Sequence, residues 1–586
     1  MYRTLLADRR LLVLLDNAAS AEQIRPLLPG SPSCCVVVTS RNRLGDLVAR
    51  DGAHALPLGL LLPDEARALL SETLGEDRLS AEPLAVDAMI RLCGSLPLAL
   101  RVAAARLAGD PGLRVADLVA EMSEGNRLDA LEPDGDEYSP LRTAFSASYG
   151  VLAPAARRLF RLLGLFPGPE FTAEAAAALL DAPVQQARRL LSALAAAHLI
   201  EPAATGRYRF HDLLREYAQE RALAEVAAAD RDAALERLLI RYLHAARAAS
   251  GTGLFPKLPG DLDRGDQQGI PDAADSARWL GAEQANLLAA VNHAARYGPR
   301  PVAWYLASAL FGYFWLHLSR ATWQATAQLV LDAAVAESSL LGQAAMHHQL
   351  GIILWDRGHA RQAMEHHTRV LDISRELGWA AGEVAALGGQ GSVEWSMARL
   401  DSAYAHVTAG LRVNREARAE YADAFGLVIL GMTCRDLGRL REAADHLELA
   451  ISSNEETGWW DDSLALQILG SVYWELGCLT DGLNALSPKV AVDAKRGYRN
   501  GRAMMLDAIA KINIELGHHD EALIQAERAF AMVKAPGRPW IQQPSATRSP
   551  PPTENSRTST NGRVPCRGVA DHPAVVLVVL GSAGAL

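Results

Sequence analysis

The stretch QLGIILWDRGHARQAMEHHTRVL, Gln349 to Leu371, has the layout of two helices joined by a glycine-containing turn. The layout returns in ILGMTCRDLGRLREAADHLELAI, Ile429 to Ile451, and in ILGSVYWELGCLTDGLNAL, Ile468 to Leu486. A small residue marks the first helix of each copy at spacings of 40, 40, 39 and 40: Gly351, Gly391, Gly431, Gly470 and Ala510. A second series runs in step with it: Ala363, Ala403, Ala443, Gly482 and Ala522. A fixed period of this length predicts stacked helix pairs that approach closely at the small residues.

The periodic region has recognisable limits on both sides. We expect the repeats over residues 331–535, preceded by a helical linker and a degenerate first repeat over 226–330. Residues 536–586 are low in complexity and rich in Pro, Ser and Thr. Such a segment buries too little apolar surface to order itself, so we expect it to be disordered. Its abrupt start after a helical pattern also suggests a reading frame that departs from its ancestral path.

Residues 1–135 alternate between strand-like and helix-like segments. LLVLLDN (Leu11 to Asn17) and CCVVVTSR (Cys34 to Arg41) are short and apolar, as buried parallel strands are. Two helices are expected in AVDAMIRLCGSLPLALRVAAARLA, with a break at Gly94 to Pro97, because proline suits the first turn of a helix but not its interior. These features predict part of an α/β domain.

Residues 136–225 have the pattern of a winged-helix domain. Amphipathic helices are expected at about 154–165, 172–180 and 184–198. HLIEPAATGRYRFHD then predicts two short strands around a turn at Thr205-Gly206. The fold class is therefore multidomain and mostly α, with a partial α/β domain, a winged helix, a helical solenoid and a disordered tail.

Four residues have the chemistry of a nucleotide site. Asp16 follows a strand, where a carboxylate can hold Mg²⁺ beside phosphates, and Arg41 follows the next strand, where a guanidinium can contact a γ-phosphate. Pro97 opens a helix whose free amides can face a ligand, and His211 follows the predicted hairpin, where an imidazole can donate to a phosphate. Taken singly, each has a plain alternative as a helix cap, an exposed loop cation or a helix connection.

In this order the four segments resemble the NB-ARC class of STAND nucleotide switches, and in particular the actinobacterial regulators of the SARP/AfsR type. The resemblance covers roughly residues 1–535 and implies tetratricopeptide repeats after the winged helix. It implies Asp16 as the metal-side acid, Arg41 as the phosphate sensor and Pro97 against the adenine. FHD resembles the MHD motif, with Phe210 in place of methionine, and implies His211 at the β-phosphate of ADP. The cofactors implied are ADP or ATP with Mg²⁺.

The chain also departs from these regulators. It contains no G-x-x-x-x-G-K-[ST] motif, so no lysine or hydroxyl can be assigned to the phosphates. We expect an N-terminally truncated chain that has lost its phosphate loop and the DNA-binding module. The family hydrolyses ATP slowly as a timer, whereas this chain is expected to bind nucleotide weakly or not at all, so its enzymatic activity stays open.

Composition narrows the range of partners. The net charge of -10 argues against non-specific binding to nucleic acid, and VQQARRLLSALAAAH offers only Arg188 and Arg189 as cations, so we expect no DNA binding through this chain alone. None of the six cysteines lies in a CxxC or CxxH spacing, which predicts neither a zinc site nor disulfides. No signal peptide is evident, and the run Ala574 to Leu580 is too short to cross a bilayer, which needs about 20 residues. We therefore expect a cytoplasmic protein.

The sequence predicts a signal-responsive regulator, acting in transcriptional control of a biosynthetic pathway, with a protein or peptide partner on the concave face of the repeats. A set of aromatic residues offers anchors for that partner, or else fills the core between repeats: Trp355, Trp395, Trp459, Trp460, Tyr473 and Trp474. Two alternatives are a non-enzymatic scaffold built on the repeats and a degenerate product without an independent function.

Overall fold

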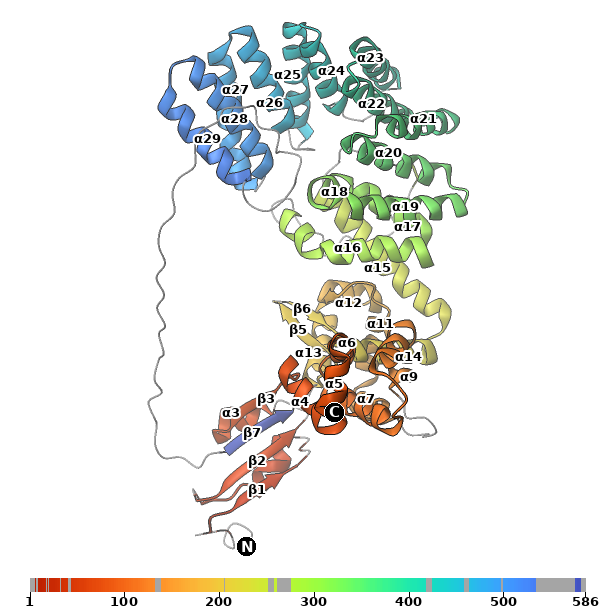
Figure 1. The fold of residues 1–586 in the computed structure, drawn as a ribbon, viewed down its shortest axis with the longest axis vertical. Helices are drawn as coiled ribbons and strands as arrows, with labels where there is room; N and C mark the ends of the chain where they lie inside the picture. Colours follow the sequence, from red (N-terminus) through yellow and green to blue (C-terminus); the bar gives the residue numbers. More distant parts are fainter. Residues whose placement is uncertain are drawn as a thin grey trace. The chain divides into compact units, whose positions relative to one another are not determined.

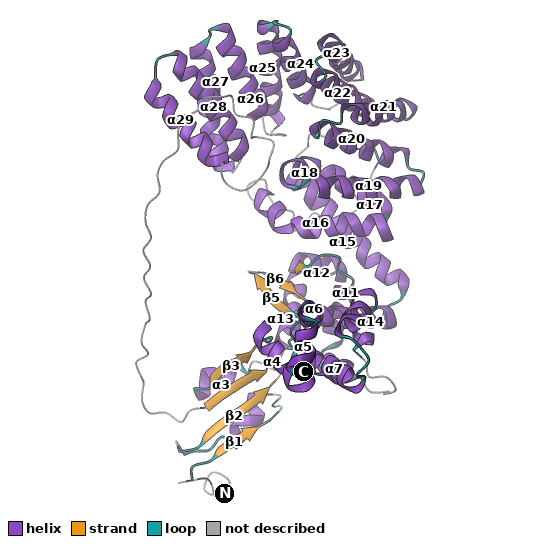
Figure 2. Cartoon of the chain, viewed as in Figure 1, coloured by secondary structure: helices purple, strands orange, loops and turns teal. Residues whose placement is uncertain are grey.

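A computed structural model describes residues 6, 9–16, 18, 20–31, 33–40, 44–131, 139–204, 206–250, 258–260, 276–417, 424–457, 463–496, 499–533 and 575–580. The chain divides into two compact units, Met1–Leu238 with Thr558–Leu586, and Leu239–Arg557. Among the described residues, helices dominate both units, and strands are confined to the first (Figure 2). The predicted multidomain, mostly α fold class is confirmed.

The first unit begins with a parallel sheet of order β1-β2-β7-β3 (Figure 1). The strands are β1 (Leu12–Leu15), β2 (Cys35–Ser40), β3 (His54–Leu58) and β7 (Val575–Leu580). Short helices accompany them, namely α2 (Ala21–Ile24), the 3-10 turn η1 (Arg25–Leu27) and α3 (Gly45–Asp51). Ile24, Val38 and Leu47 form part of a small apolar core beside the sheet. The two strands predicted around Leu11–Asn17 and Cys34–Arg41 are present and pair in parallel, but the predicted burial is wrong for β1, whose Leu12 and Leu14 are 71% and 62% exposed.

Strand β7 differs from the expectation for the tail. The sequence predicted disorder over 536–586, yet Val575–Leu580 pairs in parallel with β2 on one side and β3 on the other. The β-branched residues of this run favour a strand. The main chain of β7 pairs with groups of β2 and β3 that would otherwise be left unpaired. The remainder of the tail lies outside the described residues.

A group of helices follows the sheet segment. They are α4 (Pro63–Leu74), α5 (Glu76–Ala81), α6 (Pro83–Leu92), α7 (Pro97–Gly109), α8 (Val115–Glu124) and α9 (Arg127–Ala130). The chain breaks between α6 and α7 as predicted, and Gly94 and Ser95 there have φ of +60° and +55°. Pro97 opens α7 as its first residue.

The segment predicted as a winged-helix domain is the next part of the first unit. It comprises α10 (Pro140–Gly150), α11 (Pro154–Gly164), β4 (Glu170–Thr172), α12 (Ala173–Leu180), α13 (Val184–Ala196), β5 (Glu201–Ala204), β6 (Arg207–Arg209) and α14 (Asp212–Glu225). The strands form an antiparallel sheet of order β4-β6-β5. The three predicted helices and the hairpin are present at the expected positions. The following helix, α15 (Ala228–Ser250), runs across the division between the units.

The second unit is a row of antiparallel helix pairs (Figure 1). Its helices after α15 are α16 (Ser276–Tyr297), α17 (Arg300–Ala309), α18 (Phe311–His317), α19 (Arg320–Ala336), α20 (Leu340–Asp356), α21 (Ala360–Glu376), α22 (Ala380–Ser396), α23 (Leu400–Ala417), α24 (Ala424–Asp436), α25 (Leu440–Thr457), α26 (Ser463–Leu476), α27 (Leu479–Arg496), α28 (Arg499–Glu515) and α29 (His519–Val533). No described helix is apolar over a length that would span a membrane.

The periodic glycines have the role that the sequence predicts. Each faces one side chain of the next helix so closely that a Cβ would collide with it. The pairs, with the distance from a built Cβ, are Gly351 and His367 at 2.7 Å, Gly391 and Val407 at 2.4 Å, Gly431 and Leu447 at 2.6 Å, and Gly470 and Leu486 at 2.7 Å. One contact is thus repeated along the array, which is why the period is visible in the sequence.

Candidate functional site

His211 links the first helical group to the segment predicted as a winged helix. Its side chain is buried, and its Nε2 lies 3.0 Å from the carbonyl oxygen of Gly94. A Cβ added to Gly94 would lie 2.4 Å from both Cε1 and Nε2 of the imidazole. Glycine is therefore required at this turn, both for its positive φ and for the approach of the ring.

The second ring nitrogen of His211 is an orphaned polar atom. Nδ1 is buried and has no hydrogen-bond partner among the described residues. Since Nε2 donates its proton to the Gly94 carbonyl, the neutral ring leaves Nδ1 as an acceptor only. Only the protonated ring can offer a second N–H, so the charge of His211 decides what Nδ1 can bind.

Helix α7 starts three residues after Gly94. The residue before the helix, Leu96, makes no side-chain hydrogen bond that would cap the amides of the first turn around Pro97. Uncapped amides at the positive end of a helix dipole suit an anion or a polar heterocycle. The structure thus brings two of the predicted residues, His211 and Pro97, to one turn.

Asp16 and Arg41 are the other two predicted site residues. Asp16 follows β1 and is exposed, and its carboxylate accepts a hydrogen bond from the Thr39 hydroxyl on β2. Arg41 lies outside the described residues. No hydrogen bond or ion pair between described residues joins Asp16 to His211 or to the turn before Pro97. The predicted convergence of all four residues therefore stays a prediction.

Helix α14, which begins directly after His211, is held by acidic side chains that the sequence reasoning missed. Asp212, Glu216 and Glu220 are spaced four apart and so share one face of the helix. Arg127 contacts Asp212 and Glu216, each at 3.1 Å, and Arg142 contacts Glu220 at 2.6 Å. The regular acidic spacing in DLLREYAQE was the available signal, but its partners lie far away in the sequence.

Burial modifies the acid–base properties around this junction. Burial raises the pKa of Glu216, and the nearby Arg127 guanidinium opposes that shift. Burial also raises the pKa of the Cys93 thiol, next to Gly94, to about 12. Cys93 is therefore a neutral packing residue and not a nucleophile.

An aromatic cluster supports the residue before His211. The Phe210 ring lies 5.5 Å from the centroids of both Phe160 and Phe171. Such packing fixes the backbone that carries the histidine, so His211 reaches Gly94 from a rigid base.

Comparisons with known proteins give relatives along most of the chain, although no protein-family profile matches it. The chain is 33% identical over 557 residues to the regulatory protein AfsR of Streptomyces griseus, covering 92% of this chain and 54% of that protein. It is 44% identical over 310 residues to AfsR of Streptomyces coelicolor, covering 50% of this chain and 30% of that protein. The chain thus spans about half the length of the first relative and less of the second.

Among solved structures, a STAND protein with a tetratricopeptide repeat sensor from Pyrococcus horikoshii aligns with 88% of this chain and 80% of its own, at 15% identity and a TM-score of 0.34. Over most of its length the chain is therefore similar in sequence to the AfsR regulatory proteins, of which it spans about half or less.

Proposed function

We propose that this chain is a signal-responsive regulatory protein that acts in transcriptional control of a biosynthetic pathway. Its first unit would respond to a purine nucleotide, and its helical repeats would bind a protein or peptide partner. The sequence similarity to AfsR supports the regulatory role. The single observation that carries the nucleotide part is the buried His211 ring, which spans from the winged helix to the turn before α7.

The residues present fit one side of a nucleotide site. His211 has a buried, unsatisfied Nδ1, and α7 has uncapped amides beside it. Asp16 is a carboxylate at the end of a parallel strand, the group that Mg²⁺ prefers. ADP or ATP with Mg²⁺ would supply phosphate charge to this side: Asp16 would hold the metal, the α7 turn would face the base, and His211 would face a phosphate.

The hydrogen bond of His211 limits how the ring can contact a phosphate. With Nε2–H donated to Gly94, Nδ1 can donate to a phosphate oxygen only as part of the protonated imidazole.

The affinity itself should be low. The sequence contains no G-x-x-x-x-G-K-[ST] loop, whose backbone amides supply most phosphate contacts in such sites. In the absence of Mg²⁺, what remains for the phosphates is one charge-assisted hydrogen bond, worth about 1.5 kcal/mol, or roughly a tenfold gain in affinity.

The test compares ADP with adenosine on the full chain by saturation-transfer NMR. We expect both ligands to receive saturation on their adenine protons, with ADP bound at most about tenfold more tightly. An ADP affinity about 100-fold above that of adenosine would contradict the inference that the chain lacks most phosphate contacts. If neither ligand binds, the nucleotide part of the proposal fails and a scaffold built on the repeats remains.

Partner binding through the repeats draws support from the aromatic residues. Trp355 stacks on Trp315 with centroids 6.5 Å apart, and the Trp395 indole donates to Asp436 at 2.8 Å, so both serve contacts between repeats. Trp474 is 42% exposed and remains available as an anchor. Trp459 and Trp460 lie outside the described residues.

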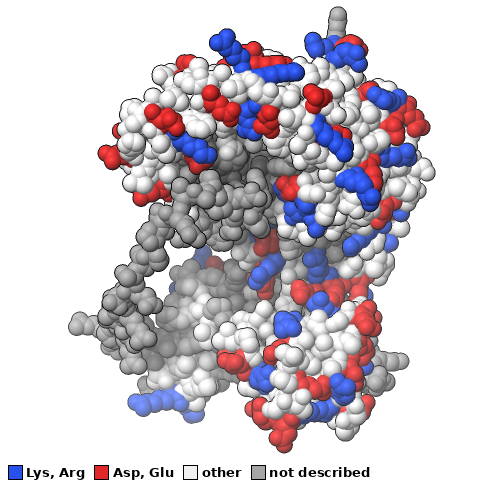
Figure 3. Space-filling view, turned by 45° about the horizontal axis from the view of Figure 1, so that its top comes forward, with Lys and Arg blue, Asp and Glu red and all other residues white. Residues whose placement is uncertain are grey.

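A protein or peptide partner fits the surface better than DNA does. Figure 3 shows acidic and basic side chains intermingled over the face that it presents. On α13, the guanidinium of Arg188 pairs with Glu174 at 3.1 Å, which reduces the positive charge it would offer to a phosphate backbone. An electrophoretic mobility assay with random duplex DNA at low salt should show no shift at micromolar protein.

A further inference from the structure

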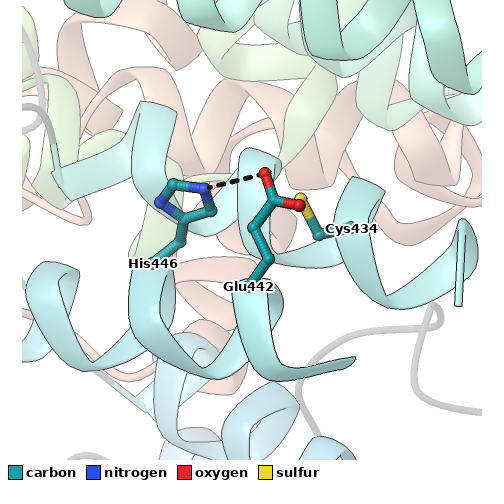
Figure 4. A group of neighbouring side chains, drawn as sticks. All are labelled: Cys434, Glu442 and His446. Carbon is teal, nitrogen blue, oxygen red and sulfur yellow. Dashed lines mark ion pairs between the residues drawn. The ribbon is translucent and has the colours of Figure 1, made fainter. Parts of the chain in front are cut away.

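Three metal-ligating side chains converge inside one helix pair of the second unit. Cys434 lies on α24, and Glu442 and His446 lie on α25. Figure 4 shows the three side chains directed toward one another, and their candidate ligand atoms all lie within 4.8 Å of each other. Glu442 and His446 are four residues apart and so share one face of α25, with His446 Nε2 3.7 Å from a Glu442 oxygen.

The surroundings of these three side chains favour the binding of an ion. Cys434 is fully buried, whereas the side chains of Glu442 and His446 are partly exposed and leave a path from solvent. The Nε2 atom of His446 is buried and has no hydrogen-bond partner among the described residues. The Tyr404 hydroxyl donates to Glu442 at 2.8 Å, which orients the carboxylate as outer partners of metal ligands do.

The groups around the cluster determine whether the Cys434 thiol is protonated when no ion is bound. Burial, and secondly the charge of Glu442, raise the pKa of the Cys434 thiol to about 12. The one cation described as facing the carboxylate is Arg439, 3.8 Å from Glu442 and half exposed. Without a bound ion the thiol is therefore protonated and unreactive, which argues against a redox or nucleophilic role.

We propose that Cys434, Glu442 and His446 bind a borderline-soft divalent cation of the Zn²⁺ class, with a fourth coordination position left open. Thiolate and imidazole select such ions over Mg²⁺ and Ca²⁺. Tetrahedral bonds of about 2.0–2.3 Å place ligand atoms roughly 3.3–3.8 Å apart. His446 Nε2 and Glu442 already have this separation, at 3.7 Å, whereas any ligand atoms at the 4.8 Å limit must approach by about 1 Å. On binding, the S–H bond breaks, the sulfur–metal bond forms and the proton leaves to solvent.

The two flanking repeats do not contain this set of three residues. Counting by the period, the positions equivalent to Cys434, Glu442 and His446 hold other sets in the flanking repeats: Glu394, Ser402 and His406 before it, and Tyr473, Asp481 and Ala485 after it. The helix-pair architecture therefore does not require these three residue types. The preceding repeat also supplies a matched control, His406, at the position equivalent to His446.

The experiment uses the full chain after treatment with a chelator, titrated with Co²⁺ and then with Zn²⁺. We expect one ion per chain by mass spectrometry of metal content, and a thiolate-to-cobalt charge-transfer band that Zn²⁺ abolishes. Because one proton is released, affinity should rise about tenfold per pH unit. Chains without a stoichiometric ion, or with cobalt bound but no thiolate band, would overturn the proposal.

Variants separate this site from other cysteines and histidines. His446→Gln and Cys434→Ser should each weaken Co²⁺ binding by about 100-fold or more, whereas His406→Gln and Cys478→Ser should leave it unchanged. If the buried Cys434→Ser chain does not fold by circular dichroism, the His446→Gln chain decides. Equal affinity of His446→Gln and the unmodified chain would overturn the assignment.

Discussion

Replacing Gly94 with alanine tests the junction between His211 and the α6–α7 turn. Gly94 has φ of +60°, a region that costs an L-residue about 1–2 kcal/mol. The new methyl group would lie 2.4 Å from two atoms of the buried His211 ring. Moving the ring costs its hydrogen bond to Gly94, about 1 kcal/mol, and overpacking adds about 1–3 kcal/mol. The total expected loss of stability in the first unit is about 3–6 kcal/mol.

A matched substitution isolates the collision from the backbone strain. Gly52 has φ of +67° and nothing within 4 Å of a built Cβ, so Gly52→Ala should cost only the conformational part, about 1–2 kcal/mol. Combining Gly94→Ala with His211→Ala removes the ring that the methyl group meets. The cost of Gly94→Ala should then fall close to that of Gly52→Ala, as a double-mutant cycle measures.

The assay benefits from the distribution of tryptophan. All eleven tryptophans lie between residues 239 and 557, so their fluorescence reports unfolding of the second unit. Circular dichroism reports both units, and its urea transition for the first unit should shift while the fluorescence transition stays in place. The reasoning is refuted if Gly94→Ala costs no more than Gly52→Ala, or costs the same with and without the His211 ring.

Other outcomes follow from particular contacts. Arg127→Met leaves the partly buried Glu216 without its cation, so the pKa of Glu216 should rise further and the first unit should lose about 1 kcal/mol, less at high salt, by urea unfolding at two ionic strengths. Burial lowers the pKa of His348 from 6.5 to about 4. The unfolded state therefore binds more protons between these values, so His348 should account for about 2 kcal/mol of the stability that the second unit loses between pH 7 and pH 5. His347 and His367, whose pKa values burial also lowers, add to that loss. Tryptophan fluorescence can follow the loss, and His348→Phe should remove the part due to His348. In Gly431→Ala the new methyl group would meet Leu447 at 2.6 Å, so this change should cost about 1–3 kcal/mol in the same assay.

Features with local or periodic causes were predictable from the sequence. The repeat glycines recur because each allows the same helix contact, as the Gly431 and Leu447 pair illustrates. The break before α7 follows from the fixed φ of Pro97 and its missing N–H. The first two strands were readable from their apolar runs alone.

Features that depend on distant partners were not predictable. Strand β3 contains Pro57 and has little of the usual strand pattern, and β7 pairs with strands more than 500 residues earlier in the chain. The contact of Arg127 with Asp212 joins residues 85 positions apart. The cluster around Cys434 was not predicted, because its candidate ligands come from two helices and their spacing matches no linear metal motif.

The most direct measurement compares the ADP and adenosine affinities of the unmodified chain and of His211→Gln. We predict that the unmodified chain favours ADP by up to about tenfold and that His211→Gln abolishes this preference. A preference for ADP that His211→Gln leaves unaffected would contradict the role assigned to the buried imidazole.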